Sequence, residues 1–253
     1  MLKSFALRSG SSGNCFCIDN YGDVYLIDIG LSYKKTTEIL SESGIDILDV
    51  KGLFITHAHS DHVLGLEVFI KNNKNSKIYI TEKTCQKLKL KENENIIFVR
   101  EDEIIKLSDM TVLVVKKEHD CVEPVSFVFE NGRKVGFFTD LGSVNNQIKN
   151  ILSNLDVIYF EANYDNEIMK NNPNLFYPYI QRLLSGVSHL SVDQCCDILC
   201  EIGRSSQRIV LSHISENTNS YENTYRKVMA RLEGIENSPE IIMSFQDEET
   251  DWI

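Results

Sequence analysis

Four side chains of types that bind metal ions lie within six residues of one another. The segment 57–62 reads HAHSDH and directly follows the apolar stretch 53–56. A strand that ends in a loop can direct alternate side chains toward one point, and imidazole and carboxylate groups are ligands that Zn, Mn and Fe accept. We therefore interpret His57 and His59 as ligands of one cation, and Asp61 and His62 as ligands of a second. The spacing disfavours a polar loop with chance histidines.

Three more candidate ligands occur in the same context, each directly or shortly after an apolar stretch. His119 follows 111–115, Asp140 follows 135–139 and His213 follows 209–212. Each residue by itself is compatible with an ordinary loop position or a buried core histidine. Together they supply the additional ligands, one of them bridging, that two cations need.

The elements that must position these residues are short apolar runs that alternate with amphipathic segments. The predicted strands are 24–30, 51–57, 77–80, 111–115, 125–129, 135–140, 156–162 and 208–213. The predicted helices are 33–44, 61–72, 145–154, 191–203 and 219–234. The pair Asn131-Gly132 between two apolar runs predicts a tight hairpin, so part of the sheet is antiparallel.

No internal repeat or flexible linker divides the 253 residues. We expect one α/β or α+β domain over residues 1–253, in which helices cover packed sheets. The polar segment 163–174 is the best candidate for an irregular excursion from this core.

The composition excludes several classes of function. The formal net charge of −11 opposes generic binding to nucleic acid or to an anionic membrane, so a phosphate-bearing substrate needs local groups or metal ions. The sequence contains neither an apolar signal-peptide core nor a run long enough to span a bilayer, so we expect a cytoplasmic protein without membrane contact.

The chain contains seven cysteines, an odd number that favours reduced thiols over a disulfide framework. A thiolate metal site at Cys15 and Cys17, or at Cys195, Cys196 and Cys200, is the alternative. Buried, unligated thiols fit the strand and helix spacings better.

The order HAHSDH, single His, Asp after an apolar strand and final His resembles the five-motif pattern of the metallo-β-lactamase superfamily. The resemblance runs from about residue 24 to residue 213 and implies a four-layer αββα sandwich with mixed sheets and the site along one sheet edge. It also implies that His57, His59 and His119 bind the first metal, that Asp61, His62 and His213 bind the second, and that Asp140 bridges both.

Two positions distinguish among branches of this superfamily. His59 stands where flavodiiron oxidoreductases have Glu, which argues against a redox role. Asp140 stands where many true β-lactamases have Cys, which argues against β-lactam hydrolysis. The remaining branches are thioesterases or lactonases and phosphodiesterases.

Two further segments, 9–14 (SGSSGN) and 177–191, resemble the YycJ/WalJ-type subfamily, whose relatives include tRNase Z and the β-CASP nucleases. The matching positions are Ser9, Ser11, Ser12, Gly13, Asn14, Tyr177, Pro178, Arg182, Ser185, His189, Leu190 and Ser191. The sequence departs from that pattern at Tyr164, Ser188 and Val192, where His, Gly and Asn are usual.

The same segments suggest an anion site. Ser191 is a good N-cap for the helix that follows, so His189 lies just before a helix N-terminus, where an anion is favoured. The alternatives are a capping-loop role for His189, a glycine turn between two strands for residues 9–14, and a solvated charge for Arg182. The expected substrate-binding residues are Ser11, Ser12, Asn14, Arg182, His189 and Ser191.

The resulting hypothesis is a hydrolase with two divalent transition-metal ions, either Zn or Mn with Fe as a third candidate. A hydroxide held between the ions attacks the substrate, and the expected catalytic residues are Asp61 and His189, with His189 as the proton donor. The leading expected substrate is a phosphodiester, and its macromolecular form is nucleic acid. The most specific expectation is a 5′-exonuclease that acts on DNA. A thioester or lactone hydrolase of the glyoxalase II type and a non-catalytic metal-binding protein are the alternatives. The sequence is also compatible with a homo-oligomer.

Overall fold

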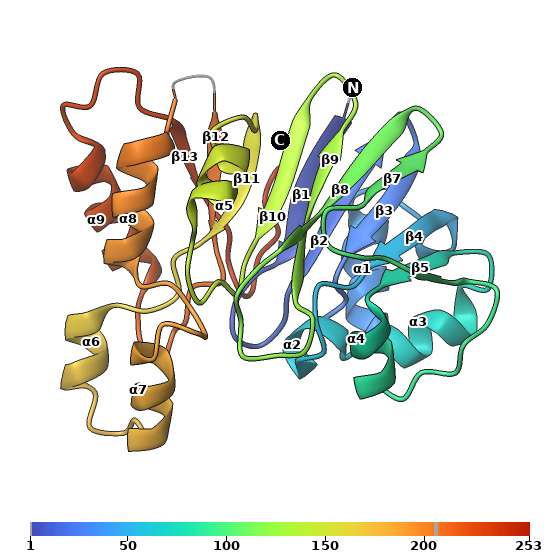
Figure 1. Cartoon of the computed structure of the whole chain (residues 1–253), viewed down its shortest axis with the longest axis horizontal. Helices are drawn as coiled ribbons and strands as arrows, with labels where there is room; N and C mark the ends of the chain where they lie inside the picture. The colour runs from blue at the N-terminus through green and yellow to red at the C-terminus, as the bar shows by residue number, and fades with distance from the viewer. Residues whose placement is uncertain (1, 205–206) are drawn as a thin grey trace.

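Two β-sheets lie face to face in the computed structural model, which describes residues 2–204 and 207–253. The first sheet has six strands in chain order (Figure 1). These are β1 (Leu2–Arg8), β2 (Cys15–Asn20), β3 (Asp23–Ile27), β4 (Val50–Phe54), β5 (Lys77–Ile80) and β6 (Ile96–Phe98). Strands β1 to β3 are antiparallel, and β3 to β6 are parallel.

The second sheet has seven strands in the order β13-β12-β11-β10-β9-β8-β7. They are β7 (Ile104–Leu107), β8 (Met110–Lys116), β9 (Val125–Glu130), β10 (Lys134–Phe138), β11 (Val157–Glu161), β12 (Arg208–Ser212) and β13 (Glu240–Met243). β9 and β10 form the hairpin predicted from Asn131-Gly132, and β10 to β13 are parallel.

Helices cover the outer faces of both sheets. The described helices are α1 (Tyr33–Glu42), α2 (Ser60–Val63), α3 (Leu66–Asn72), α4 (Glu82–Lys87), α5 (Asn146–Leu152), α6 (Asn166–Asn171), α7 (Tyr177–Leu184), α8 (Val192–Ile202) and α9 (Tyr221–Leu232), with a 3-10 turn at Ile47–Asp49. α1 and α3 pack on the first sheet, and α5, α8 and α9 pack on the second (Figure 1). This confirms the predicted αββα sandwich with mixed sheets.

Strand β11 shows why apolar runs without polar alternation form the centre of the sandwich. Val157 and Tyr159 point into the core between the sheets, whereas Ile158 and Phe160 point into the core under α5 and α8. Because successive side chains of a strand point to opposite faces, a strand that is covered on both faces must be apolar throughout.

Parallel strands of both sheets end at one edge, where the candidate ligands follow them. β3 and β4 lead to Asp28 and His57, while β10 and β12 lead to Asp140 and His213. In open parallel sheets such carboxyl ends are the usual place for a site.

Several expectations for the elements need correction. The predicted helix 61–72 is two helices, because the Gly65 N–H donates to the Ile29 carbonyl oxygen and the Asp61 carbonyl oxygen accepts from the Asn14 N–H, so the helical bond between Gly65 and Asp61 is not formed. The segment 163–174 is not wholly irregular, because Asp165 caps α6. Strands β1, β2, β6, β7 and β13 and helices α4, α6 and α7 were not predicted.

The segment 9–14 connects β1 to β2, so the expectation of a turn between two strands holds for it. All seven cysteines are free, and five are buried, in agreement with the expectation of unpaired thiols. None of the described helices is long and apolar enough to cross a bilayer.

Asp165 joins the excursion that contains α6 to helix α9. One carboxylate oxygen caps α6 by accepting the N–H groups of Glu167 and Ile168, and the other lies 2.6 Å from Lys227 Nζ on α9. Burial disfavours the charged form, but the hydrogen bonds from Lys227 and from the backbone outweigh it and lower the pKa of Asp165 to about 2.

We expect Asp165→Asn to keep the helix cap but to lose the ion pair, which costs about 1–2 kcal/mol of unfolding free energy at neutral pH. Because the folded-state pKa is lowered from an unfolded value near 3.9, the difference between the proteins is full above about pH 4 and shrinks toward pH 2. Urea unfolding at several pH values measures it. A penalty that stays constant down to pH 2 would contradict this account.

Candidate metal centre

All six histidines of the chain lie in one cluster at this sheet edge. Neighbouring rings have centroids between 4.2 Å and 5.9 Å apart. The members are His57, His59, His62, His119, His189 and His213. Sequence segments up to about 150 residues apart thus converge on one point, as the strand ends predict.

The first candidate metal site is the set His57, His59 and His119, whose ligand atoms lie within 4.8 Å of one another. The Nδ1 atom of His59 lies 3.1 Å from Nε2 of both other histidines. Burial lowers the pKa of His119 to about 3 and lowers that of His57 well below the usual value. Three neutral imidazoles that direct nitrogen lone pairs at one point fit a divalent transition metal.

The second candidate site is the set Asp61, His62, Asp140 and His213. Burial would lower the pKa of His62, but Asp140 and Asp28 raise it to about 10. Burial would also raise the pKa of Asp140, but His213 and His62 keep it well below the usual value. The buried carboxylates therefore need positive charge close to them. Protons on the imidazoles supply this charge, and a divalent cation would supply it in their place.

Asp140 lies between the two sets. Its Oδ2 atom is 3.1 Å from His62 Nε2, and its Oδ1 atom is 3.8 Å from His119 Nε2 and 3.6 Å from His213 Nε2. The side chain is buried, and among the described residues Oδ2 accepts no hydrogen bond of good geometry. A buried carboxylate oxygen without a hydrogen bond is costly unless a cation binds it, so the centre fits two metal ions.

Three hydrogen-bond acceptors orient the imidazole rings. Asp28 Oδ2 lies 2.6 Å from His62 Nδ1, and the carbonyl oxygen of Ser188 lies 2.6 Å from His119 Nδ1. Glu161 Oε1 lies 2.7 Å from His189 Nδ1 and 3.1 Å from His213 Nδ1. Because a carboxylate or carbonyl oxygen can only accept, each Nδ1 carries the proton and each Nε2 is presented to the site.

Asp28 and Glu161 were not among the predicted site residues. Each lies near the end of a predicted strand, and a charged residue late in an apolar buried run is the signal that was available. Glu161 is fully buried, and although burial opposes ionisation, His189 and His213 lower its pKa to about 2.

The backbone is strained at three positions of the site. Asp28, Asp140 and His213 have φ values of 58°, 57° and 54°. Asp28 and His213 are the first residues after β3 and β12, and Asp140 is the second after β10; the left-handed conformation is unfavourable for most side chains other than glycine. Such strain persists where surrounding structure holds it, and it is concentrated at functional sites.

A cavity of about 390 Å³ opens over both sets. It is lined by Ser11, His59, Ser60, Asp61, Asp120, Asp140, Asn163, Tyr179, Arg182, His189 and His213. Of the predicted substrate-binding residues, the structure thus brings Ser11, Arg182 and His189 to the cavity.

The other three predicted substrate-binding residues do not line this cavity. Ser12 is exposed and donates its backbone N–H to Gln246. Asn14 is buried and ties residues 9–14 to the Asp61 loop, since its N–H donates to the Asp61 carbonyl oxygen over 2.8 Å. Ser191 is buried and forms a capping box with Gln194 at the start of α8.

Arg182 forms a bidentate ion pair with Asp120, with 2.9 Å between Nη2 and Oδ1. It is therefore not merely a solvated charge. The pair connects α7 to the His119 loop at the mouth of the cavity.

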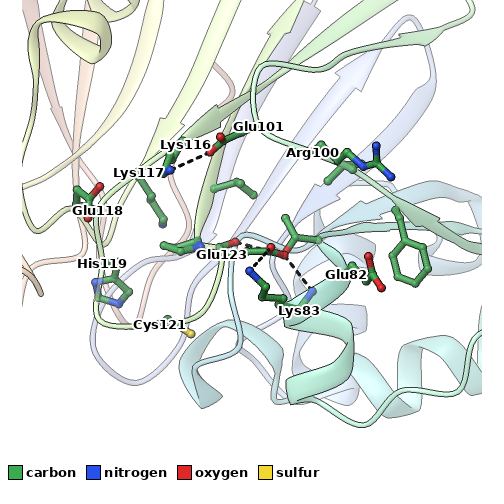
Figure 2. A pocket seen from close by; sticks show the side chains of 15 residues that line it. Glu82, Lys83, Arg100, Glu101, Lys116, Lys117, Glu118, His119, Cys121 and Glu123 are labelled. Atoms are coloured by element: carbon green, nitrogen blue, oxygen red, sulfur yellow. Dashed lines mark hydrogen bonds and ion pairs between the residues drawn. The ribbon is translucent and has the colours of Figure 1, made fainter.

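A second cavity of about 590 Å³ lies beyond the 119–121 segment (Figure 2). His119 and Cys121 lie at one end of it, and Arg100 lies at the other. Two ion pairs lie in its walls. Lys83 Nζ is 2.9 Å from Glu123 Oε1, and Lys116 Nζ is 3.1 Å from Glu101 Oε2. Of the candidate metal ligands, His119 borders this second cavity.

The comparisons with known proteins agree with this geometry. The family model described as "Beta-lactamase superfamily domain" matches residues 25–214. Exodeoxyribonuclease YycJ from Bacillus anthracis is 30% identical over 236 residues, which are 90% of this chain and 88% of that protein. The chain belongs to the β-lactamase superfamily, on the YycJ/WalJ branch. Exodeoxyribonuclease WalJ from Streptococcus pneumoniae, at 29% identity over 91% of this chain and 88% of that protein, is similar as well.

A solved structure of this fold matches nearly all of the chain. The crystal structure of the metallo-β-lactamase fold protein YhfI from Bacillus subtilis superimposes with a TM-score of 0.74 and covers 98% of both chains at 14% identity. Membership of the superfamily, together with the His and Asp clusters, confirms the prediction of an enzyme that is a metal-dependent hydrolase.

Gly30 lies where three segments of the metal centre meet. A Cβ atom there would lie 1.7 Å from the Asp61 carbonyl oxygen and 2.6 Å from the Asn14 backbone nitrogen. Since both contacts are with backbone, no side-chain movement can relieve them.

We expect Gly30→Ala to displace the 57–62 loop, to cost about 1–3 kcal/mol of unfolding free energy and to weaken metal binding. Gly10→Ala is the matched control, because its Cβ would meet only the side chain of Gln246, at 3.1 Å. Urea unfolding and elemental analysis measure the two effects. Equal metal content in both variants would contradict the assigned packing.

Proposed function

We propose that the protein is a two-metal phosphodiesterase that removes nucleotides from the ends of DNA. The proposal rests on the position of Asp140 between the two candidate metal sites. Beside it lies His189, whose Nδ1 atom is held by Glu161. The names of the YycJ and WalJ relatives, both exodeoxyribonucleases, support DNA as the substrate.

In this proposal His57, His59 and His119 would hold the first cation, whereas Asp61, His62 and His213 would hold the second. Asp140 would serve both, since its carboxylate faces both sets. Two divalent cations at these positions would lower the pKa of bound water and stabilise charge on phosphoryl oxygens. The imidazole-rich donor sets favour Zn or Mn, with Fe as a third candidate.

His189 is the proposed proton donor to the leaving oxygen. Its ring lines the cavity, and Glu161 holds its Nδ1, so that Nε2 is the atom presented to substrate. A buried carboxylate behind an imidazole fixes the orientation and the tautomer of the ring. Glu161 is thus a positioning residue, because it acts through His189.

Arg182 and Ser11 are the proposed contacts to the substrate phosphates. Both line the cavity, and the guanidinium is already oriented by Asp120. Asp61, whose Oδ2 atom lies 3.5 Å from His213 Nε2, is the other proposed catalytic residue, since its carboxylate can accept a proton from the attacking water.

We expect purified protein to bind close to two transition-metal ions per chain. Asp140→Ala should reduce occupancy at both sites because its carboxylate faces both sets, whereas His119→Ala should mainly weaken the first. Elemental analysis after dialysis and titration with Zn or Mn measure the occupancies. Equal, small losses in the two variants would argue against the bridging position of Asp140.

The function is tested with a set of chemically distinct substrates. The proposal expects metal-dependent cleavage of bis(4-nitrophenyl) phosphate and of oligodeoxynucleotides, and labels at the 5′ or 3′ end report the polarity. Cleavage of thioesters or lactones with no cleavage of any phosphodiester would replace the proposal with a glyoxalase II type of activity.

We expect His189→Ala to retain its metals and to lower turnover of oligodeoxynucleotides by about 100-fold or more, the usual scale for loss of a general acid. The loss should be much smaller for bis(4-nitrophenyl) phosphate, because nitrophenolate leaves without protonation. Glu161→Gln should show the same dependence on the leaving group, with a smaller loss. A uniform loss on both substrates would assign His189 to phosphate binding, and a lost metal ion would assign it as a ligand.

A further inference from the structure

Lys117 is a buried lysine to which the metal centre described above assigns no role. It is the first residue after β8 and is 2% exposed, whereas lysine is almost never fully buried unless it is paired. Its Nζ atom donates to the carbonyl oxygen of Thr139 over 2.7 Å and so links the ends of β8 and β10, the strands that flank β9. A carbonyl oxygen carries no full charge, so this hydrogen bond alone does not balance a buried ammonium group.

Three buried carboxylates of the metal centre balance the charge of Lys117. Burial lowers the pKa of Lys117, whereas Asp140, Asp28 and Glu161 oppose this shift and favour the ammonium form. Each of these carboxylates is at most 1% exposed and therefore needs positive charge close to it. Lys117 supplies such charge without a bound ion, so it is a cation that is built into the centre.

The hydrogen bond from Lys117 also fixes the segment 139–141, which contains Asp140. Asp140 has a left-handed backbone with a φ of 57°, a conformation that persists only where surrounding structure holds it. Lys117 holds the carbonyl oxygen that precedes Asp140, and Glu161 Oε2 accepts the N–H of Leu141, which follows it, over 2.8 Å. Neither hydrogen bond requires a metal ion, so both can keep Asp140 in place in the empty centre.

The same charge is unfavourable for a cation in the first candidate metal site. Burial is the main cause of the low pKa of His57 and of His119, and the charge of Lys117 lowers both values further. The ammonium group therefore lies close enough to both rings to repel positive charge that they bind. The interaction that stabilises the empty centre thus opposes a bound metal ion.

We propose that Lys117 is a positioning residue that holds Asp140 in place when the centre is empty and whose charge lowers the affinity of the centre for metal ions. This inference rests on the metal centre of the proposed function and not on its substrate. Replacement of Lys117 by an uncharged residue should cost the empty protein more unfolding free energy than the loaded protein, because metal ions then supply the missing charge. By thermodynamic linkage, such a variant binds metal more tightly than the parent protein does.

The test replaces Lys117 with methionine and, separately, with glutamine. Methionine is a flexible unbranched side chain that has neither the charge nor the donor, whereas glutamine keeps a donor without the charge. Lys116→Met is the matched control, because Lys116 is the adjacent residue, is exposed and forms an ion pair with Glu101 over 3.1 Å. Figure 2 shows the side chains of the two lysines pointing in different directions.

The first measurement is the Kd for Zn, determined by competition with a chromogenic chelator. We expect both Lys117 variants to lower this Kd at least about fivefold, the lower end of the scale for loss of a unit charge near a divalent cation inside a protein. We expect Lys116→Met to bind Zn as the parent protein does. If Lys117 served only as a structural support, its loss would deform the centre and the variants would bind Zn more weakly.

The second measurement is urea unfolding, once in EDTA and once in saturating Zn. The difference in urea midpoint between Lys117→Met and the parent protein should be larger in EDTA than in Zn. An equal difference in the two conditions, or a Kd for Zn that is unchanged or raised in both Lys117 variants, would overturn the proposal.

Failure of both Lys117 variants to fold in saturating Zn would also overturn it, because bound metal should replace the missing charge. Neither measurement involves a substrate. A parent protein that binds Zn but cleaves no phosphodiester would therefore overturn the proposed function alone, and the role of Lys117 would still be decided by the affinity for Zn.

Discussion

A buried carboxylate that must be balanced by positive charge is the central constraint on this structure. Asp140 lies in a fully buried position, and its two oxygens face the imidazoles of different histidine sets. Burying an unpaired charge costs far more than any single packing contact supplies, so this residue is acceptable only with cations or protonated imidazoles around it. The same requirement extends to Glu161, which lies behind His189 and His213.

The charge requirement explains why the surrounding structure is so strongly specified. Four imidazoles have Nδ1 held by an acceptor that comes from another segment of the chain, and three residues of the site have left-handed backbone conformations after their strands. The two mixed sheets support the site rigidly. Their strands end at the same edge and cannot shift in register without exposing the core. The strain is therefore a cost of function that the packed sandwich offsets.

The acidic surface and the phosphodiester chemistry are compatible because the positive charge is local. In the proposed function, metal ions and Arg182, which Asp120 orients, supply it at the cavity. The net charge of −11 repels phosphates in general, so a phosphodiester must be held by these local groups.

The sequence by itself determined the class of fold and the ligand types. Apolar runs with intervening amphipathic segments indicated a layered α/β or α+β structure, and the HAHSDH spacing indicated metal chemistry, because both depend on short-range periodicity. Weaker local patterns were missed: β1 and β2 flank a glycine turn, and α6 depends on its Asp165 cap and on Lys227 far away in the chain.

Only the tertiary structure decided which polar groups serve the site. Asn14, a match to a subfamily motif, is a buried support for the Asp61 loop, whereas Glu161, which no motif singled out, holds two histidines. Ser188 departs from the subfamily pattern, but only its backbone carbonyl oxygen contacts His119 Nδ1. Most residue types can supply that carbonyl. Residue spacing specifies the side chains that one strand end presents, but the hydrogen-bond partner of each ring comes from a distant segment, and that pairing exists only once both sheets have packed.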